Sequence, residues 1–261
     1  MQNYQEINAK SVDSWVAEDW EWGRPITTEA FAKAKSGDWD MVLTPKKPVP
    51  KEWFAPYLTN TQLSGVALLG LASGGGQQMP IFAALGANCT VLDYSEAQLA
   101  TEKMVAEREG YDINIVRADM TKPLPFADNS FDIIFHPVSN CYVEDVHHVW
   151  RECYRILRPG GVLLAGMDNG INYVFGDEDG ISTLEVVQKL PFNPLKDPDL
   201  FELCMKNNWG VQFSHTIEEQ VGGQLEAGLV LTHLYDDNDE YGIGAYFPNF
   251  LATRAVKPKQ A

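Results

Sequence analysis

The chain has 261 residues, of which 45% are hydrophobic and 21% charged, and its formal net charge is −16. This length fits one α/β domain with elaborations, and the composition is that of an ordinary globular protein. Such a charge repels phosphate backbones and leaves no basic stripe, so a nucleic-acid partner is not expected. It is compatible with a neutral or cationic small substrate, and equally with solubility alone.

The cysteines and the N-terminus suggest a compartment. Cys89, Cys141, Cys153 and Cys204 form no CxxC pair, which disfavours a zinc site and indicates reducing surroundings. No signal peptide is visible, and no apolar run approaches the roughly 20 residues that span a membrane. We therefore expect a cytoplasmic protein without a metal or a membrane partner; both a monomer and a homodimer remain open.

Residues 1–60 differ in character from the remainder. They contain closely spaced tryptophans at positions 15, 20, 22 and 39 and a proline-punctuated tail at 44–51. A helix is predicted over 28–35, because Thr27 or Thr28 can cap it and Gly37 can end it. The tryptophans either attach this segment to the main domain or line a substrate pocket as part of a cap.

From Val66 onward, strands and helices alternate. Apolar strands are predicted at Val66–Leu71, Asn88–Leu92, Ile113–Arg117, Phe131–Phe135 and Val162–Gly166. Helices are predicted at 77–85, at 96–110 after a capping box that starts with Ser95, and at 146–157. This alternation of strands and helices predicts a doubly wound parallel sheet.

The alternation stops after Asp168. Residues 170–215 are rich in Asn, Asp, Gly and Pro, and only weak helices are predicted in them, near 183–189 and 199–207. A helix near 217–227 and strands at 229–235 and 250–256 then suggest a closing β-hairpin. The expected fold is α/β, a mostly parallel seven-stranded sheet with an antiparallel edge strand. A cap (1–60) precedes the main domain (61–261), which carries an inserted lid (170–215).

A glycine-rich turn follows the first strand, and an acid ends the second. Gly74 and Gly76 carry no Cβ, so a cofactor can approach the backbone closely and meet the N–H groups of the next helix. Asp93 can accept hydrogen bonds from both ribose hydroxyls of an adenosine. The stretch 66–93 therefore reads as the first βαβ half of a nucleotide-type cofactor site.

Five features in register resemble one known family. They are the glycine turn, Asp93, Ala118-Asp119-Met120 after strand three, Phe131-Asp132 at strand four, and Leu157-Arg-Pro-Gly-Gly161 before strand five. From Val66 to Val174 the chain is similar to class I S-adenosylmethionine-dependent methyltransferases of the methyltransferase-11-like, small-molecule type. The resemblance implies a Rossmann-like domain, S-adenosylmethionine as cofactor and S-adenosylhomocysteine as product. A nicotinamide dehydrogenase is the alternative, but the turn fits G-x-G-x-x-G poorly.

The resemblance also implies the cofactor contacts. They are expected at Ala72, Ser73, Gly74, Gly76, Gln78, Asp93, Tyr94, Asp119, Met120 and His136. Asp119 would accept from the adenine amino group, and Met120 would pack on the ring. The family usually carries an acid and then a glycine where this chain has Gly70 and Ala72. Ser73, Gln77 or Gln78 could supply the polar contacts in their place.

Methyl transfer is an in-line displacement, so the protein mainly orients the nucleophile and excludes water. No catalytic triad is needed, and His136 and Tyr142 are the candidates at the reactive face. His136 could serve as base or cofactor contact, or it could make only a structural hydrogen bond. Trp22, Asn140, Asn169 and Tyr173 are expected to bind substrate. A catalytically silent cofactor-binding protein is the alternative function, supported by Gly70.

Overall fold

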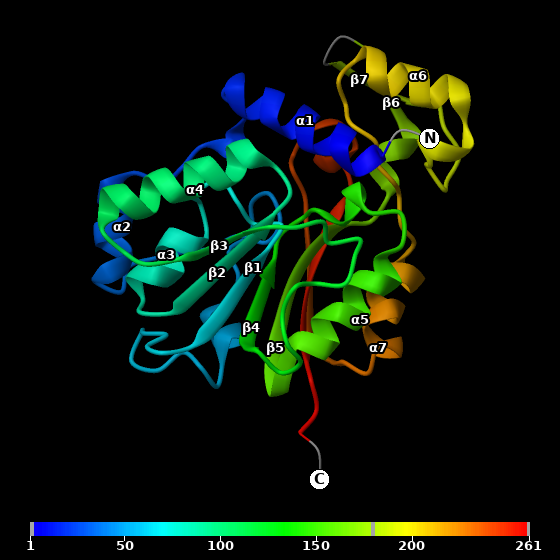
Figure 1. Cartoon of the computed structure of the whole chain (residues 1–261). Coiled ribbons are helices and arrows are strands. Elements are labelled where there is room, and N and C mark those ends of the chain that lie inside the picture. Colours follow the sequence, from blue (N-terminus) through cyan, green and yellow to red (C-terminus); the bar gives the residue numbers. More distant parts are fainter. Residues whose placement is uncertain (1–2, 179–180, 260–261) are drawn as a thin grey trace.

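The computed structural model describes residues 3–178 and 181–259. Its centre is a seven-stranded sheet in the order β3-β2-β1-β4-β5-β9-β8, with helices on both faces (Figure 1). The strands are β1 (Ala67–Leu71), β2 (Asn88–Asp93), β3 (Asn114–Arg117), β4 (Phe131–His136), β5 (Leu157–Asp168), β8 (Val230–Asp237) and β9 (Phe250–Val256). The α-helices are α1 (Tyr4–Ala17), α2 (Thr28–Lys35), α3 (Met79–Ala84), α4 (Glu96–Glu109), α5 (Val146–Ile156), α6 (Pro198–Lys206) and α7 (Gly223–Glu226).

Local capping chemistry sets several helix ends where the sequence predicts them. The side chains of Thr27 and Ser95 accept from backbone N–H groups in the first turns of α2 and α4. Gly110 ends α4 in the left-handed conformation, which glycine adopts without strain. Pro80 lies in the first turn of α3, where its missing N–H costs no helical hydrogen bond.

The two faces of the sheet bury separate apolar cores. One core packs α3 and the segment 39–54 against β1 and β4, and includes Phe82 and Phe135. The other packs α5 against β4 and β5, with the fully buried Trp150 among its largest members. Burial on both faces explains why the central strands read as continuous apolar runs.

The predicted mostly parallel sheet with antiparallel pairing at one edge is confirmed. β9 pairs antiparallel with both β5 and β8, so the reversed strand is the last but one, and β8 forms the outer edge. β1, β2, β3, β4 and β5 pair parallel, which brings their carboxyl ends to one edge of the sheet.

Two elements differ from the sequence prediction. The helix expected near 183–189 is wrong: β7 (Ile181–Val186) pairs antiparallel with β6 (Phe175–Glu178). The β-branched residues of this stretch favour an extended backbone over a helix. Helix α1 is the second difference, because no helix is expected over 4–17; its N-cap is Asn3, whose side chain accepts from the Gln5 N–H.

The N-terminal segment continues from α1 across the sheet and packs against β5. The Leu43 carbonyl accepts from the Val138 N–H at 3.2 Å, and Leu43 is buried. A Cβ on Gly166 of β5 would lie 2.1 Å from the Leu43 carbonyl oxygen. Only a residue without a side chain therefore allows this close approach.

We expect Gly166→Ala to lower the free energy of unfolding by about 1–3 kcal/mol or more, because the obstructing atom is backbone and cannot rotate away. Denaturant unfolding measures the change. Gly222→Ala is the matched control, since its Cβ would meet only Glu218 Cγ at 3.7 Å. Equal stability losses in the two variants would contradict this packing.

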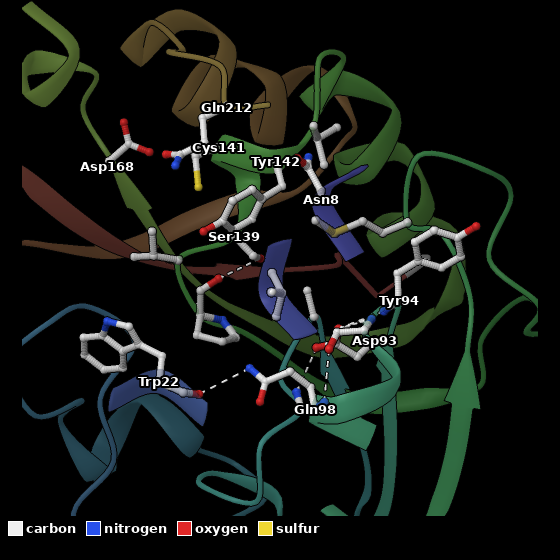
Figure 2. Close-up of a pocket in the computed structure, with 18 of the residues that line it drawn as sticks. Asn8, Trp22, Asp93, Tyr94, Gln98, Ser139, Cys141, Tyr142, Asp168 and Gln212 are labelled. Carbon is white, nitrogen blue, oxygen red and sulfur yellow. Dashed lines mark hydrogen bonds between the residues drawn. The ribbon is translucent and has the colours of Figure 1, made fainter. Parts of the chain in front are cut away.

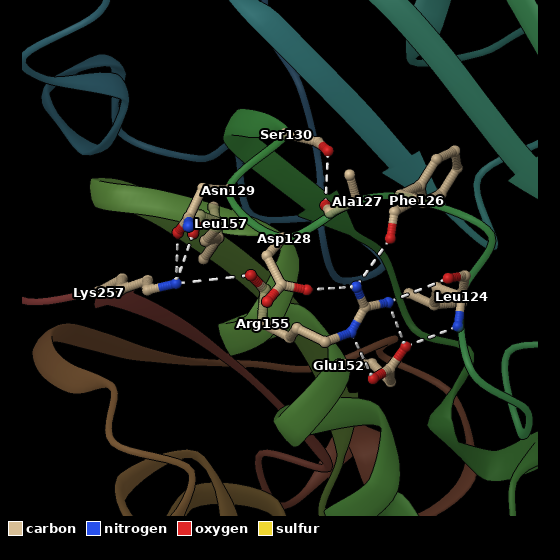
Figure 3. Close-up of polar contacts among 10 residues, drawn as sticks. All are labelled: Leu124, Phe126, Ala127, Asp128, Asn129, Ser130, Glu152, Arg155, Leu157 and Lys257. Atoms are coloured by element: carbon tan, nitrogen blue, oxygen red, sulfur yellow. Dashed lines mark hydrogen bonds and ion pairs between the residues drawn. The ribbon is translucent and has the colours of Figure 1, made fainter.

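A polar cluster fastens the loop before β4 to α5 (Figure 3). Arg155 donates to Glu152 at 2.7 and 2.8 Å, to Asp128 at 2.9 Å, and to the carbonyls of Leu124 and Phe126 at 3.0 and 2.7 Å. Glu152 also accepts from the Leu124 N–H at 2.6 Å. This one guanidinium thus satisfies two loop carbonyls and two carboxylates.

Candidate active site

A cavity of about 450 Å³ opens at the carboxyl ends of the parallel strands. Its walls come from the tips of β1, β2, β4 and β5, from the segment 42–45, and from α1 (Figure 2). This volume falls within the range of small-molecule sites, and open α/β sheets bind ligands at this edge.

Helix α1 crosses over this end of the sheet (Figure 1) and is tied down on both sides. On one side Asp13 accepts from the Ser95 hydroxyl at 2.5 Å, and the Glu6 carboxylate pairs with the Tyr94 hydroxyl. On the other, the Asn8 amide bonds the backbone of Val211 at 2.6 and 2.9 Å. The helix therefore bridges β2 and the segment that precedes the last helix.

Two acids hold the glycine turn. The Gly74 N–H donates to Asp93 Oδ2 at 3.0 Å, and the Gly76 N–H donates to Glu102 Oε2 at 2.9 Å. Burial raises the pKa of Glu102 to about 7, although the Gly76 N–H and the Tyr111 hydroxyl oppose the shift. The role of Glu102, which lies on α4, is not visible in the turn sequence.

The structure explains Gly70 and shows that Ala72 adopts a backbone conformation that glycine would adopt with less strain. A Cβ on Gly70 would lie 2.6 Å from Met79 Cε, so the Met79 thioether occupies the space of the usual acid. Ala72 has a φ of +49°, the left-handed region that favours glycine. The remaining polar groups bond within the protein: Ser73 donates to Gln78 at 3.0 Å, and Gln77 donates to the carbonyls of Glu21 and Arg24.

Asp93 ends β2 on the cavity wall. Its Oδ1 accepts from the N–H groups of Tyr94 and Ser95 at 2.8 and 3.0 Å, in addition to the Gly74 bond at Oδ2. Burial raises the pKa of Asp93, and the three N–H groups oppose that shift. A carboxylate has about four acceptor positions, so one remains for a ligand hydroxyl rather than two.

Most of the expected cofactor residues lie together on this wall. Those that line the cavity are Ala72, Gly74, Gln78, Asp93, Tyr94, Asp119 and Met120. Ser73 and Gly76 are buried and do not line the cavity. The residues on the wall fit an adenosine, because Asp93 keeps one acceptor position and Met120 offers an apolar surface. Gly74 does not leave the open space that the sequence predicts, since a Cβ there would lie 2.8 Å from Gln98 Cβ and 3.0 Å from Asp93 Oδ2.

The expected roles of His136 and Asn140 do not fit their placement. His136 is fully buried behind the cavity wall, with Nδ1 2.9 Å from the Leu71 carbonyl and Nε2 2.8 Å from Asn140 Oδ1. Asn140 is also fully buried and donates to Gln220 at 2.8 Å. Burial lowers the pKa of His136, and its two ring nitrogens connect the β4 tip to Leu71 and Asn140. The polar groups of both side chains bond to other protein groups, and the sequence does not distinguish such residues from ligand-binding ones.

The other predicted site residues fall into two groups, those that line the cavity and one that does not. Trp22, Tyr142 and Tyr173 line the cavity, whereas Asn169 turns its amide to the Pro248 carbonyl at 2.8 Å. Burial raises the pKa of Tyr142 well above the usual tyrosine range. This hydroxyl therefore stays protonated and can donate a hydrogen bond.

Asp168 lies on the cavity wall at the end of β5, at the start of the stretch 168–173 that the sequence places in the same cleft. It is 4% exposed, and its Oδ1 accepts from the Gly170 N–H at 2.9 Å. Burial raises its pKa to about 6. The available signal was an acid at the end of an apolar strand, the same pattern that marks Asp93. Asn8, Trp20, Cys141 and Gln212 also line the cavity.

We expect Asp168→Asn to stabilise the protein at pH 8 by up to about 3 kcal/mol, and not at pH 4. Because the pKa is raised in the folded state, the contribution of Asp168 to the free energy of unfolding is fully present below pH 4. It is lost as the pH rises to about 6 and above. Unfolding curves at both pH values test this, with exposed Asp236→Asn as control. A stability gain that is equal at both pH values would contradict it.

Within the part of the chain that the structure describes, no group of three or more His, Cys, Asp or Glu side chains could hold a metal ion. All four cysteines are buried and free. No described helix is long and apolar enough to cross a membrane.

The sheet order, the reversed β9 and the acid-tipped β2 beside a glycine turn define a Rossmann-like methyltransferase architecture. Comparison with known proteins agrees, because residues 69–165 match the methyltransferase domain family. The chain is 39% identical over 253 residues to the uncharacterized methyltransferase YbaJ of Bacillus subtilis (strain 168), covering 96% of this chain and 97% of that protein. The chain belongs to the class I S-adenosylmethionine-dependent methyltransferases.

Other similarities are more partial. Sterol 24-C-methyltransferase ERG6B of Gibberella zeae is 33% identical over 101 residues, which are 38% of this chain and 26% of that enzyme. A solved S-adenosylmethionine-dependent methyltransferase from Mesorhizobium loti superposes with a TM-score of 0.59 at 22% identity, over 78% of this chain and 94% of that one. The second similarity shows the fold alone.

Proposed function

We propose that the cavity binds S-adenosylmethionine along β1 and β2 and a small-molecule methyl acceptor beneath α1. Asp93 on the cavity wall beside the glycine turn carries this proposal, because its carboxylate keeps one acceptor position for a ribose hydroxyl. Asp119 and Met120 face the same space, where an adenine would lie. When bound, S-adenosylmethionine supplies a methyl group already activated by its sulfonium.

The protein contributes positioning and the exclusion of water. We propose residues 1–60 as the cap and residues 170–215 as the lid. Their support is that α1 bonds both Ser95 and Val211, and that Trp22 and Tyr173 line the cavity. Tyr142 would orient the acceptor as a donor, and His136 would hold the β4 tip.

A small acceptor also fits the charge of the cavity. Its described wall contains three carboxylates and no Lys, Arg or His side chain. Phosphate-bearing partners would meet only repulsion there. We therefore propose no nucleic-acid substrate, and an intracellular protein that acts without a membrane.

Isothermal titration calorimetry with S-adenosylmethionine tests the proposal. One-to-one binding is expected, with S-adenosylhomocysteine competing for the site. The absence of heat at millimolar cofactor would overturn the cofactor site. Binding without S-adenosylhomocysteine formation from any amine, phenol or thiol would favour a catalytically silent protein.

A further inference from the structure

Asp168 is a buried carboxylate with an unfilled bonding position. Oδ1 accepts from the Gly170 N–H, but Oδ2 has no hydrogen-bond partner in the described part of the chain. A buried polar atom without a partner costs free energy, and an ionised one costs more. The residue belongs to the cavity wall, so a ligand can supply the missing donor.

Among the residues that the structure describes, no positively charged side chain lines the cavity beside this carboxylate. The titratable groups around it are Cys141, Tyr142 and Tyr173, whose pKa values burial and the Asp168 charge both raise. All three are neutral at physiological pH. The other acids of the cavity wall, Asp93 and Asp119, add negative charge, and no described wall residue is basic. The cavity is therefore complementary to a cation.

The surrounding walls suit a cation attached to an apolar body. Aromatic side chains line the same cavity, namely Trp20, Trp22, Tyr94, Tyr142, Tyr173 and Phe250. Their apolar faces favour hydrophobic groups, and the π faces of aromatic rings also attract cations. Shape and charge thus select the same class of molecule.

We propose that Asp168 binds the protonated amine of the methyl acceptor, so that the substrate class is an amine with an apolar or aromatic body. This assignment rests on the proposed function. In the step that prepares the acceptor, one N–H bond of the ammonium breaks and an O–H bond forms at Asp168 Oδ2. The electron pair of the broken bond stays on nitrogen as the nucleophilic lone pair. Asp168 then returns its proton to water after the product leaves.

The rival occupant of this position is the ammonium group of the cofactor's own methionine. Asp93 on β2 and Asp168 on β5 are three strand positions apart in the order β2-β1-β4-β5, about 14 Å. The glycine turn follows β1, between these two residues, and it would hold the cofactor's amino-acid end. Asp168 therefore lies beyond the expected cofactor, on the acceptor side.

Matched probes separate these possibilities. The full-length protein, saturated with S-adenosylhomocysteine, is titrated with benzylamine, phenethylamine and hexylamine and with the corresponding alcohols. At least one amine is expected to bind tenfold or more tightly than its alcohol at pH 7.5. In Asp168→Asn the ratio is expected to fall to about one, whereas S-adenosylhomocysteine affinity changes less than threefold. Asp236→Asn, an exposed acid, keeps the parental ratio.

The dependence on pH gives a second readout. The amine preference is expected to weaken below pH 6, because the Asp168 carboxylate becomes protonated, while alcohol binding stays constant. Amines that bind no better than their alcohols would overturn the inference, and so would tenfold weaker S-adenosylhomocysteine binding by Asp168→Asn. If the parent does not bind S-adenosylhomocysteine at all, the proposed cofactor site is wrong, and the amine assignment that rests on it is overturned as well. The unfolding curves of Asp168→Asn show separately that the variant is folded.

Discussion

Asp93→Ala is expected to weaken S-adenosylmethionine binding by about 30- to 2000-fold. The variant lacks the charge-assisted hydrogen bond from the carboxylate to a ribose hydroxyl, which contributes about 1.5–3 kcal/mol. It also lacks the bond from the Gly74 N–H to the carboxylate, which contributes about 0.5–1.5 kcal/mol. The second loss leaves the glycine turn less well ordered before the cofactor arrives. Calorimetry with parent and variant measures the change.

Two controls separate the cofactor contact from the support of the turn. Asp93→Asn removes the charge but keeps an oxygen for the N–H groups of Tyr94 and Ser95. It should bind the cofactor better than Asp93→Ala and worse than the parent. Asp236→Ala alters an exposed acid and should bind like the parent. Parental affinity in Asp93→Ala would remove the main support for the proposed site.

Arg155→Ala is expected to lower the free energy of unfolding by about 2–4 kcal/mol. The substitution leaves Glu152, which is 9% exposed, without its cation and two loop carbonyls without their donor. The loop connects β3 and β4, whose tips carry cavity residues. Thermal and denaturant unfolding measure the loss.

Arg151 provides the matched control in the same helix. It is 60% exposed and lies 3.6 Å from Asp145, so Arg151→Ala should change stability by no more than about 0.5 kcal/mol. Arg155 holds the pKa of Glu152 below its usual range, so the stability from this pair is present at neutral pH and lost on acidification. The gap between parent and Arg155→Ala should therefore narrow as the pH falls. A constant gap would show that Glu152 is not part of the effect.

Local signals account for much of the cofactor half of the site. Two local patterns reveal Gly74 and Asp93 without coordinates. One is a glycine-rich turn after a strand, and the other is an acid that ends an apolar strand. The same reasoning could not separate His136 from Tyr142. Both follow or end β4, but a ring that bonds Leu71 and Asn140 faces inward, and only packing decides that direction.

The acceptor half depends on residues that are distant in the chain. Asn8 and Val211 are 203 positions apart, and Asp168 becomes a wall residue only when α1 and the segment 42–45 close the space above β5. The β-branched residues of Ile181–Val186 favour an extended backbone, but only the tertiary structure shows that β7 pairs with β6.

The sequence by itself determined the α/β order, the glycine turn and the acid at the end of β2, because each depends on the period of apolar residues or on the backbone freedom of single positions. The tertiary structure alone decided that Met79 fills the space beside Gly70, that Glu102 holds the turn, and that Asp168 Oδ2 has no hydrogen-bond partner among the described residues. These three features depend on which side chains meet across separate elements. Burial and hydrogen bonding, rather than residue type, set the chemistry of those groups.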